Sequence, residues 1–178
     1  MSKGAALATR DENEALFRES FDRFYLREFT PMVALALAVS GSSSAAEDLA
    51  QEAMVRAHKN WDHVSGYDKP GAWVRRVTIN LARSALRKRA SETKALFRVA
   101  GSSGPVPEPD AADQSLWTAV KRLPKNQRAA VALFYLEDMT VRDIAEILEC
   151  SESTAKVHLH RGRAALAAVL DREPEEKS

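Results

Sequence analysis

Apolar side chains recur every three or four residues along most of the chain. This spacing is typical of α-helices that bury one face, and no segment shows the strict alternation of a half-buried strand. The sequence therefore predicts an all-α fold. In the first half, helices are expected at about Asp11–Phe29, Thr30–Gly41, Ser44–Asn60 and Pro70–Arg89.

Short polar motifs mark the ends of these helices. Thr30 followed by Pro31 is typical of an N-cap and a first helical position, so a new helix is expected to begin there. Ser44 and Glu47 have the spacing of a capping box. The segment from Trp61 to Lys69 is expected to be a loop.

The composition changes between about Ser91 and Asp113. This segment contains Gly, Ser and Pro but almost no large apolar residue, which is typical of a flexible linker. From Val99 to Val120 there are three acidic residues and no basic one. The sequence thus predicts two small helical domains, 11–90 and 114–172, joined by a flexible acidic linker at 91–113.

The segment from Met139 to Leu166 has the pattern of a helix-turn-helix. Thr140 with Asp143 can cap the first helix, and Ser151 or Ser153 can cap the second. The outer face of the second helix holds Ser153, Val157, His160 and Arg161, flanked by Lys156 and Arg163. A polar, basic helix on a small apolar support suits the major groove of DNA, and a plain solvated face is the alternative.

A second basic face is predicted on the helix that begins at Pro70. Its residues recur at spacings of four, three and four: Arg76, Asn80, Arg83 and Arg87. Guanidinium groups bind phosphates, and an amide both donates and accepts hydrogen bonds at a base edge. Tyr67 and Trp73 are close in sequence and offer stacking surfaces for an unpaired base, although Trp73 also suits the core. The pattern favours single-stranded DNA over a solvated arginine face.

The helix from Ser44 carries one apolar residue on a polar outer side, formed by Asp48, Gln51, Glu52, Val55 and Lys59. An apolar residue ringed by polar groups is typical of a docking face. Single exposed apolar residues are also common on ordinary surfaces. This pattern alone therefore leaves both interpretations open.

Charge and composition exclude several function classes. The net charge is only +1, but Ala72 to Ser91 holds six basic residues and no acidic one, so local potentials would steer a nucleic acid. Cys150 is the only cysteine, and the four histidines lack metal-site spacing, so neither a disulfide nor a metal is expected. No catalytic constellation is present. The sequence predicts no cofactor, no small-molecule substrate and no enzymatic activity.

The longest apolar run, Met32 to Val39, is too short to span a bilayer. The N-terminus lacks a signal-peptide pattern. A cytoplasmic protein without membrane insertion is therefore expected.

Four segments together resemble the extracytoplasmic-function (ECF) sigma factors of bacterial RNA polymerase, which form group 4 of the sigma-70 family. In the family's order they are AEDLAQEAMVRAHKNW (46–61), AWVRRVTINLARSALRKR (72–89), LPKNQRAAVALFYLEDMTVRDIAEIL (123–148) and STAKVHLHRGRAAL (153–166). The resemblance covers about Phe21 to Leu170. It implies a region 2 domain, a linker that threads through polymerase, and a region 4 helix-turn-helix domain.

The resemblance also implies roles for particular residues. Docking on the clamp helices of the largest polymerase subunit would use Asp48, Gln51, Glu52, Val55 and Arg56. The minus-ten element would be bound by Tyr67, Trp73, Arg76, Asn80, Arg83 and Arg87, with Asn80 and the loop 65–69 capturing a flipped base. The minus-thirty-five element would be bound by Ser153, Thr154, Lys156, Val157, His160, Arg161 and Arg163. An anti-sigma factor is a further expected partner, beside core polymerase and promoter DNA.

The chain departs from the family pattern at Ser84, where Asp is common, and at Val157 and His160. These differences concern the promoter sequence that is preferred. Two other functions were weighed. A stand-alone helix-turn-helix regulator would dimerise on palindromic duplex DNA, and a helical adaptor would have no DNA role.

Overall fold

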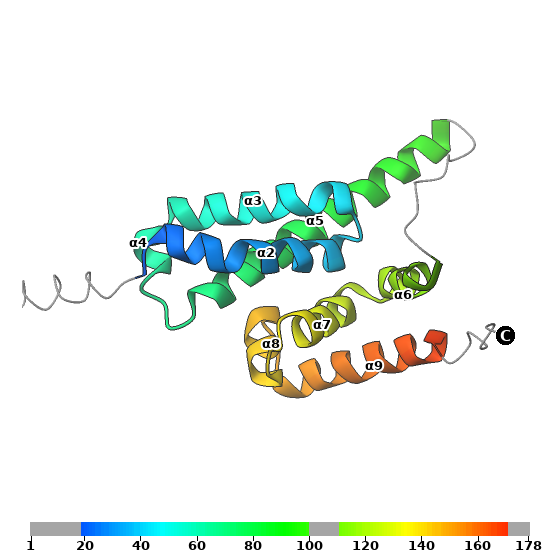
Figure 1. Cartoon of the computed structure of the whole chain (residues 1–178). Helices are drawn as coiled ribbons and strands as arrows, with labels where there is room; N and C mark the ends of the chain where they lie inside the picture. Colours follow the sequence, from blue (N-terminus) through cyan, green and yellow to red (C-terminus); the bar gives the residue numbers. More distant parts are fainter. Residues whose placement is uncertain (1–18, 100–110, 171–178) are drawn as a thin grey trace, which may run out of the picture.

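The computed structural model describes residues 19–99 and 111–170, and these are helical with no strand among them. The all-α prediction is confirmed. The first unit contains α2 (Phe21–Ser40), α3 (Ser43–Lys59), the one-turn α4 (Trp61–Val64) and α5 (Pro70–Val99) (Figure 1). The predicted helical stretch before residue 19 and the charged tail from residue 171 lie outside the described residues.

The helix α2 runs through Pro31 without a break, so the prediction of a new helix at Thr30 is wrong. Proline inside a helix costs about 3 kcal/mol, since it removes one hydrogen bond and crowds the preceding turn. Burial offsets this cost because Phe24, Met32 and Leu35 lie on the buried side of α2, before and after the proline. The predicted C-cap at Gly41 is confirmed by its left-handed conformation, with φ at 67°.

The helix α3 begins at Ser43 rather than at a capping box. Its N-cap is Ser42, which makes no side-chain capping hydrogen bond, and the Ser42 and Ser44 hydroxyls lie 3.2 Å apart instead. The predicted loop from Trp61 contains the single turn α4, whose Trp61 ring packs at 4.8 Å from the Phe24 ring. This aromatic contact holds the start of the loop against α2.

The helix α5 continues to Val99, about ten residues past its predicted end. The segment ASETKALFRV contains no Gly or Pro and many good helix formers, and the first breaker is Gly101. The predicted linker boundary at residue 91 is therefore wrong, because 91–99 are helical. The stretch 100–110 lies outside the described residues, and α6 begins at Ala111.

The second unit contains α6 (Ala111–Arg122), α7 (Lys125–Leu136), α8 (Val141–Leu148) and α9 (Glu152–Leu170). The predicted helix-turn-helix is present as α8 and α9. Thr140 caps α8 by accepting from the Asp143 backbone N–H, and Ser151 caps α9 by accepting from the Thr154 N–H. These caps fix the short turn between the two helices.

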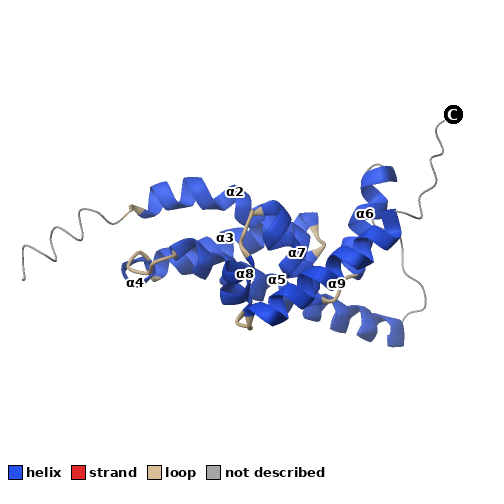
Figure 2. Ribbon diagram, turned by 90° about the horizontal axis from the view of Figure 1, so that it is seen from below, coloured by secondary structure: helices blue, strands red, loops and turns tan. Residues whose placement is uncertain are grey.

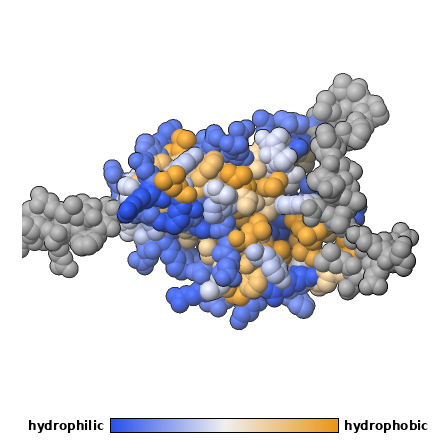
Figure 3. Space-filling model, in the orientation of Figure 1, coloured by the Kyte–Doolittle hydropathy of each residue, from blue (hydrophilic) through white to orange (hydrophobic). Residues whose placement is uncertain are grey.

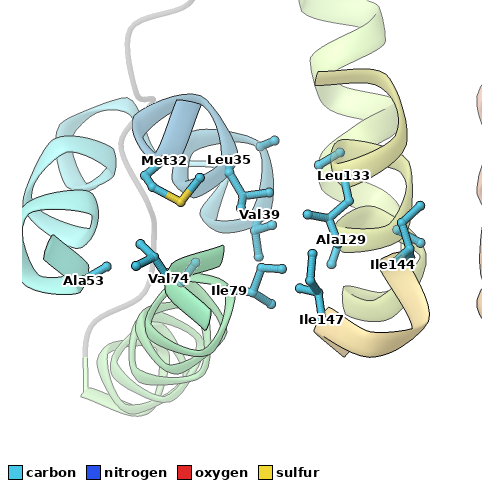
Figure 4. Close-up of a cluster of buried hydrophobic side chains, with 14 of the residues drawn as sticks. Met32, Leu35, Val39, Ala53, Val74, Ile79, Ala129, Leu133, Ile144 and Ile147 are labelled. Carbon is cyan, nitrogen blue, oxygen red and sulfur yellow. The ribbon is translucent and has the colours of Figure 1, made fainter. Parts of the chain in front are cut away.

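The two units share one hydrophobic core. Val39 and Ile79 of the first unit face Ala129, Leu133 and Ile147 of the second across their junction (Figure 4). The view from below shows α8 beside α5, in agreement with the contacts between these helices (Figure 2). The domains are thus packed together, and the basic side of α5 lies against α8.

Candidate nucleic-acid and polymerase interfaces

The helix α9 is held by a close inner contact and presents an exposed outer face. Ala155 and Leu159 are buried, and a Cβ added at Gly162 would lie 2.6 Å from Val131 Cγ2 of α7. Only glycine permits so close an approach without movement. The exposed outer residues are Ser153, Thr154, Lys156, Val157, His160 and Arg161. The predicted outer face of this helix is thus exposed, with Val157 exposed at 44%.

Three of the predicted DNA contacts on α9 have protein partners. Ser153 Oγ and Thr154 Oγ1 each lie 2.8 Å from Ser151 Oγ within the capping cluster. Arg163 lies over the Phe134 ring at 4.3 Å and near the Tyr135 ring at 5.5 Å. This cation–π contact between Arg163 and α7 stabilises the packing of α9 on α7.

The outer side of α3 is open in the structure. Asp48, Gln51, Glu52, Val55 and Arg56 are all exposed. Arg56 donates to Glu52 at 2.8 Å, one turn apart, and Val55 is exposed at 45%. A groove of about 460 Å³ runs beside this face, between α2 and α3. A polar ring around an exposed valine next to a groove suits a protein partner.

The predicted face of α5 divides into two parts. Asn80 and Arg87 are exposed, whereas Arg76 and Arg83 are half-buried against the second unit. Arg83 donates to Asn126 at 3.1 Å. Tyr67 is exposed at 49%, but Trp73 packs against the core. Asn80 and Tyr67 are thus accessible from solvent, whereas Trp73 is packed in the core.

Burial and neighbouring charges shift several pKa values. Desolvation, with Arg87 nearby, lowers the pKa of Arg83, and desolvation with Arg161 and Arg83 nearby lowers that of His158. Burial raises the pKa of the Cys150 thiol. These shifts favour an uncharged His158 and an inert thiol at neutral pH.

Neither a metal site nor a membrane span occurs in the part of the chain that the structure describes. No group of three or more His, Cys, Asp or Glu residues there could hold a metal ion. None of the helices in 19–99 and 111–170 is long and apolar enough to cross a bilayer.

Comparison with known proteins identifies the family. The model for sigma-70 region 2 matches residues 25–92, and the model for sigma-70 region 4 matches residues 113–166. The ECF RNA polymerase sigma factor SigW of Bacillus subtilis is 30% identical over 145 residues, which are 73% of this chain and 78% of SigW. The factor EcfG of Rhodopseudomonas palustris is 31% identical over 140 residues, 77% of each chain. The chain belongs to the ECF sigma factors.

Two solved structures share this fold. RpoE of Bartonella quintana, solved in complex with the anti-sigma factor NepR, is similar with a TM-score of 0.71 and 25% identity. The match covers 86% of this chain and 98% of RpoE. CnrH, solved with the cytosolic domain of CnrY, has a TM-score of 0.62 at 22% identity, covering 86% and 88%. The first unit of this sigma factor is therefore region 2, and the second is region 4.

A buried ion-pair cluster joins the two regions of this sigma factor. Arg75 of α5 lies between Glu28 of α2, at 2.8 Å, and Glu137, at 2.6 Å. The side chains of all three residues are no more than 10% exposed. One guanidinium thus links α2, α5 and the segment between α7 and α8.

A second, exposed set of ion pairs borders this cluster. Lys69 lies 2.5 Å from Asp143 and 3.4 Å from Glu146. Hydrogen bonds from Lys69 and Thr140 lower the pKa of Asp143, and the same carboxylates raise the pKa of Lys69. The contribution of Asp143 is present above the ordinary pKa of Asp and is lost as pH falls through the lowered value.

Sequence reasoning missed the residues that join the regions. Arg75 was grouped only with a basic run, and Arg128 was noted only as part of the LPKNQR motif. The segment 137–149 is rich in acidic residues, and the segment 72–91 has basic residues but no acidic one. This charge contrast is the one signal in the sequence that the two segments could pair. Helical periodicity does not tell which helices meet, so the pairing itself needed the structure.

Proposed function

We propose that this ECF sigma factor uses three helix faces, two to recognise the promoter and one to bind core polymerase. The outer face of α9 reads the minus-thirty-five duplex, the exposed part of α5 with Tyr67 binds the minus-ten strand, and the outer face of α3 docks on polymerase. The observation that carries the proposal is the exposure of α9's polar residues on a helix whose opposite side is fixed to α7 and α8. An α-helix so presented fits the major groove.

Asn80 is the residue proposed to capture an unpaired base of the minus-ten element. Its amide is exposed on α5, between Arg76 and Arg83, and can donate and accept at a base edge. Tyr67 offers a nearby stacking surface. Base capture offsets the few kcal/mol that unpairing costs, so binding favours the melted promoter. Trp73 acts behind this site by holding α5 in the core.

Two DNA-binding regions on one chain raise the effective concentration of the second contact once the first has formed. Promoter binding then depends on both elements and on core polymerase. The protein supplies recognition and melting, while catalysis of RNA synthesis belongs to the polymerase. It acts in the cytoplasm, where transcription occurs in bacteria.

An anti-sigma factor is proposed as a regulatory partner, because RpoE of Bartonella quintana was solved with the anti-sigma factor NepR. An apolar groove of about 560 Å³ lies between α6, α7 and α9 and supports this proposal. Its exposed members include Leu116, Tyr135 and Leu136. Figure 3 shows hydrophobic surface where α7 and α9 meet.

Run-off transcription tests the function. Purified core polymerase should start at new sites in a genomic promoter library only when this protein is added.

Glu52→Arg should reduce affinity for core polymerase by about tenfold, since charge reversal removes the Arg56 pair and opposes the partner's charge. Glu92→Arg, the same change on an exposed residue of α5, serves as the control. Equal affinities of the two variants would reject docking through α3. No new transcripts, with tight binding of the protein alone to palindromic duplexes, would favour the stand-alone regulator.

Asn80→Ala should impair promoter opening more than the initial binding of duplex DNA. The expected loss in open complexes is about tenfold, which corresponds to one or two lost hydrogen bonds to a base. Permanganate reactivity of unpaired thymines measures opening, and filter binding measures the closed complex. Arg87→Ala is the comparison, because it should weaken both steps through the phosphate backbone. A uniform loss for Asn80→Ala would contradict base capture.

A further inference from the structure

Acidic side chains of region 4 cover basic side chains of region 2. Arg76 donates to Glu149 Oε1 at 3.0 Å and to the Glu146 carbonyl oxygen at 3.0 Å. Lys69 contacts Asp143 and Glu146, and the buried Arg75 contacts Glu137. Glu137, Asp143, Glu146 and Glu149 are here called the acidic surface. Its residues lie on or next to α8, which packs on α5.

The acidic surface engages groups that the proposed function assigns to DNA. Arg76 is a proposed contact of the minus-ten strand, and Lys69 ends the loop proposed to help capture its base. A guanidinium binds carboxylate and phosphate with the same planar set of donors. While Arg76 donates both to Glu149 and to the Glu146 carbonyl, it has fewer donors to offer a phosphate. Carboxylates of region 4 therefore pair with cations that the proposed function assigns to DNA phosphates.

The ion pairs between the two regions are weaker at the exposed edge of the junction than at its buried centre. Arg75 is buried with its two carboxylates, whereas Glu146, Glu149 and Lys69 are exposed. Exposed ion pairs contribute little individually and are screened by salt. Glu149 also has φ at 54°, a left-handed conformation that side chains rarely adopt. The outer pairs are thus weak enough for a polyanion to displace.

We propose that the outer carboxylates of the acidic surface are built-in competitors that occupy Arg76 and Lys69 until single-stranded DNA displaces them. This inference rests on the proposed function for its DNA role. The ion-paired arrangement reduces the apparent affinity of region 2 for DNA by the fraction of molecules in which the outer pairs are open. Loss of the outer pairs raises that fraction, and so does increasing ionic strength.

The variant Glu146→Gln/Glu149→Gln removes two exposed carboxylates without touching the Thr140–Asp143 cap. It should bind a random-sequence, fluorescein-labelled single-stranded DNA roughly fivefold more tightly than the wild type. Fluorescence anisotropy measures the affinity, without polymerase. Asp22→Asn/Glu47→Gln gives the same net charge on α2 and α3, away from α5, and should show a smaller gain. X-ray scattering should show the same radius of gyration for both variants and the wild type, because the shared hydrophobic core and the buried Arg75 pairs keep the regions together.

A salt titration of the wild type is an independent measurement that needs no variant. The side-chain N–H resonances of Arg76, followed by NMR, should shift as sodium chloride is added, because screening weakens the outer pairs. The proposal is overturned if the acidic-surface variant matches its control in affinity or if salt leaves the Arg76 resonances unchanged. Salt-dependent resonances with no DNA binding by any form would instead reject the DNA role of α5. That outcome separates failure of the proposed function from failure of the ion-pair contact.

Discussion

Replacing Arg75 by methionine is expected to lower the free energy of unfolding by about 3–5 kcal/mol, the usual cost of breaking a buried ion pair. Arg75 pairs with two buried carboxylates, Glu28 and Glu137, and Glu28 also pairs with Arg27 at 2.9 Å. The loss of Arg75 leaves Glu137 buried without its cation and leaves Glu28 paired with Arg27 alone. Methionine keeps much of the side chain's apolar length, so the loss reflects charge rather than volume. Urea denaturation followed by circular dichroism measures the change.

The triple variant Arg75→Met/Glu28→Gln/Glu137→Gln tests the cause of this loss. If uncompensated charge dominates, neutral amides should recover much of the stability, because they cost far less to bury. Arg142→Met, an exposed position on α8, should change stability by less than about 0.5 kcal/mol. An unchanged loss in the triple variant would mean that packing, and not charge, explains the effect.

The amphipathic helices and the helix-turn-helix could be predicted because local rules decide them. Thr140 and Asp143 are three residues apart, so the cap of α8 follows from the sequence, as does the outer face of α9. Pro31 shows the limit of such rules. Its local preference is to begin a helix, but buried contacts of α2 on both sides of it prevail. The end of α5 was misplaced because a change in composition was taken as the end of a helix.

The junction between the regions could not be predicted because it joins residues far apart in sequence. Arg76 and Glu149 are 73 positions apart, and Arg75 and Glu137 are 62 apart. An arginine stripe on α5 has the same pattern whether it faces solvent, DNA or another helix. Only the docking of α8 on α5 separates Arg76 and Arg83 from the exposed Asn80 and Arg87. The predicted site residues on α5 therefore differ in their accessibility to solvent.

Arg128 carries a second large effect, because it is buried and donates to three backbone carbonyls. Its guanidinium reaches the carbonyl of Val39, near the end of α2, and those of Lys121 and Leu123. Carbonyls at a helix C-terminus lack partners within the helix, and a cation is favoured there. Arg128 thus stabilises the ends of α2 and α6 together, across the two regions. Burial lowers the pKa of the Arg128 guanidinium.

Arg128→Met is expected to cost about 3 kcal/mol, because buried carbonyls lose their donor and cannot all reach water. Arg128→Lys keeps the charge but not the planar fork, so it should restore only part of this loss. Arg122→Met, an exposed arginine at the end of α6, is the matched control. Hydrogen exchange adds a local test. If Arg128 joins the regions, protection should fall at the C-terminal turn of α2 as well as in α6, whereas a fall confined to α6 and α7 would show that the contact with Val39 contributes little.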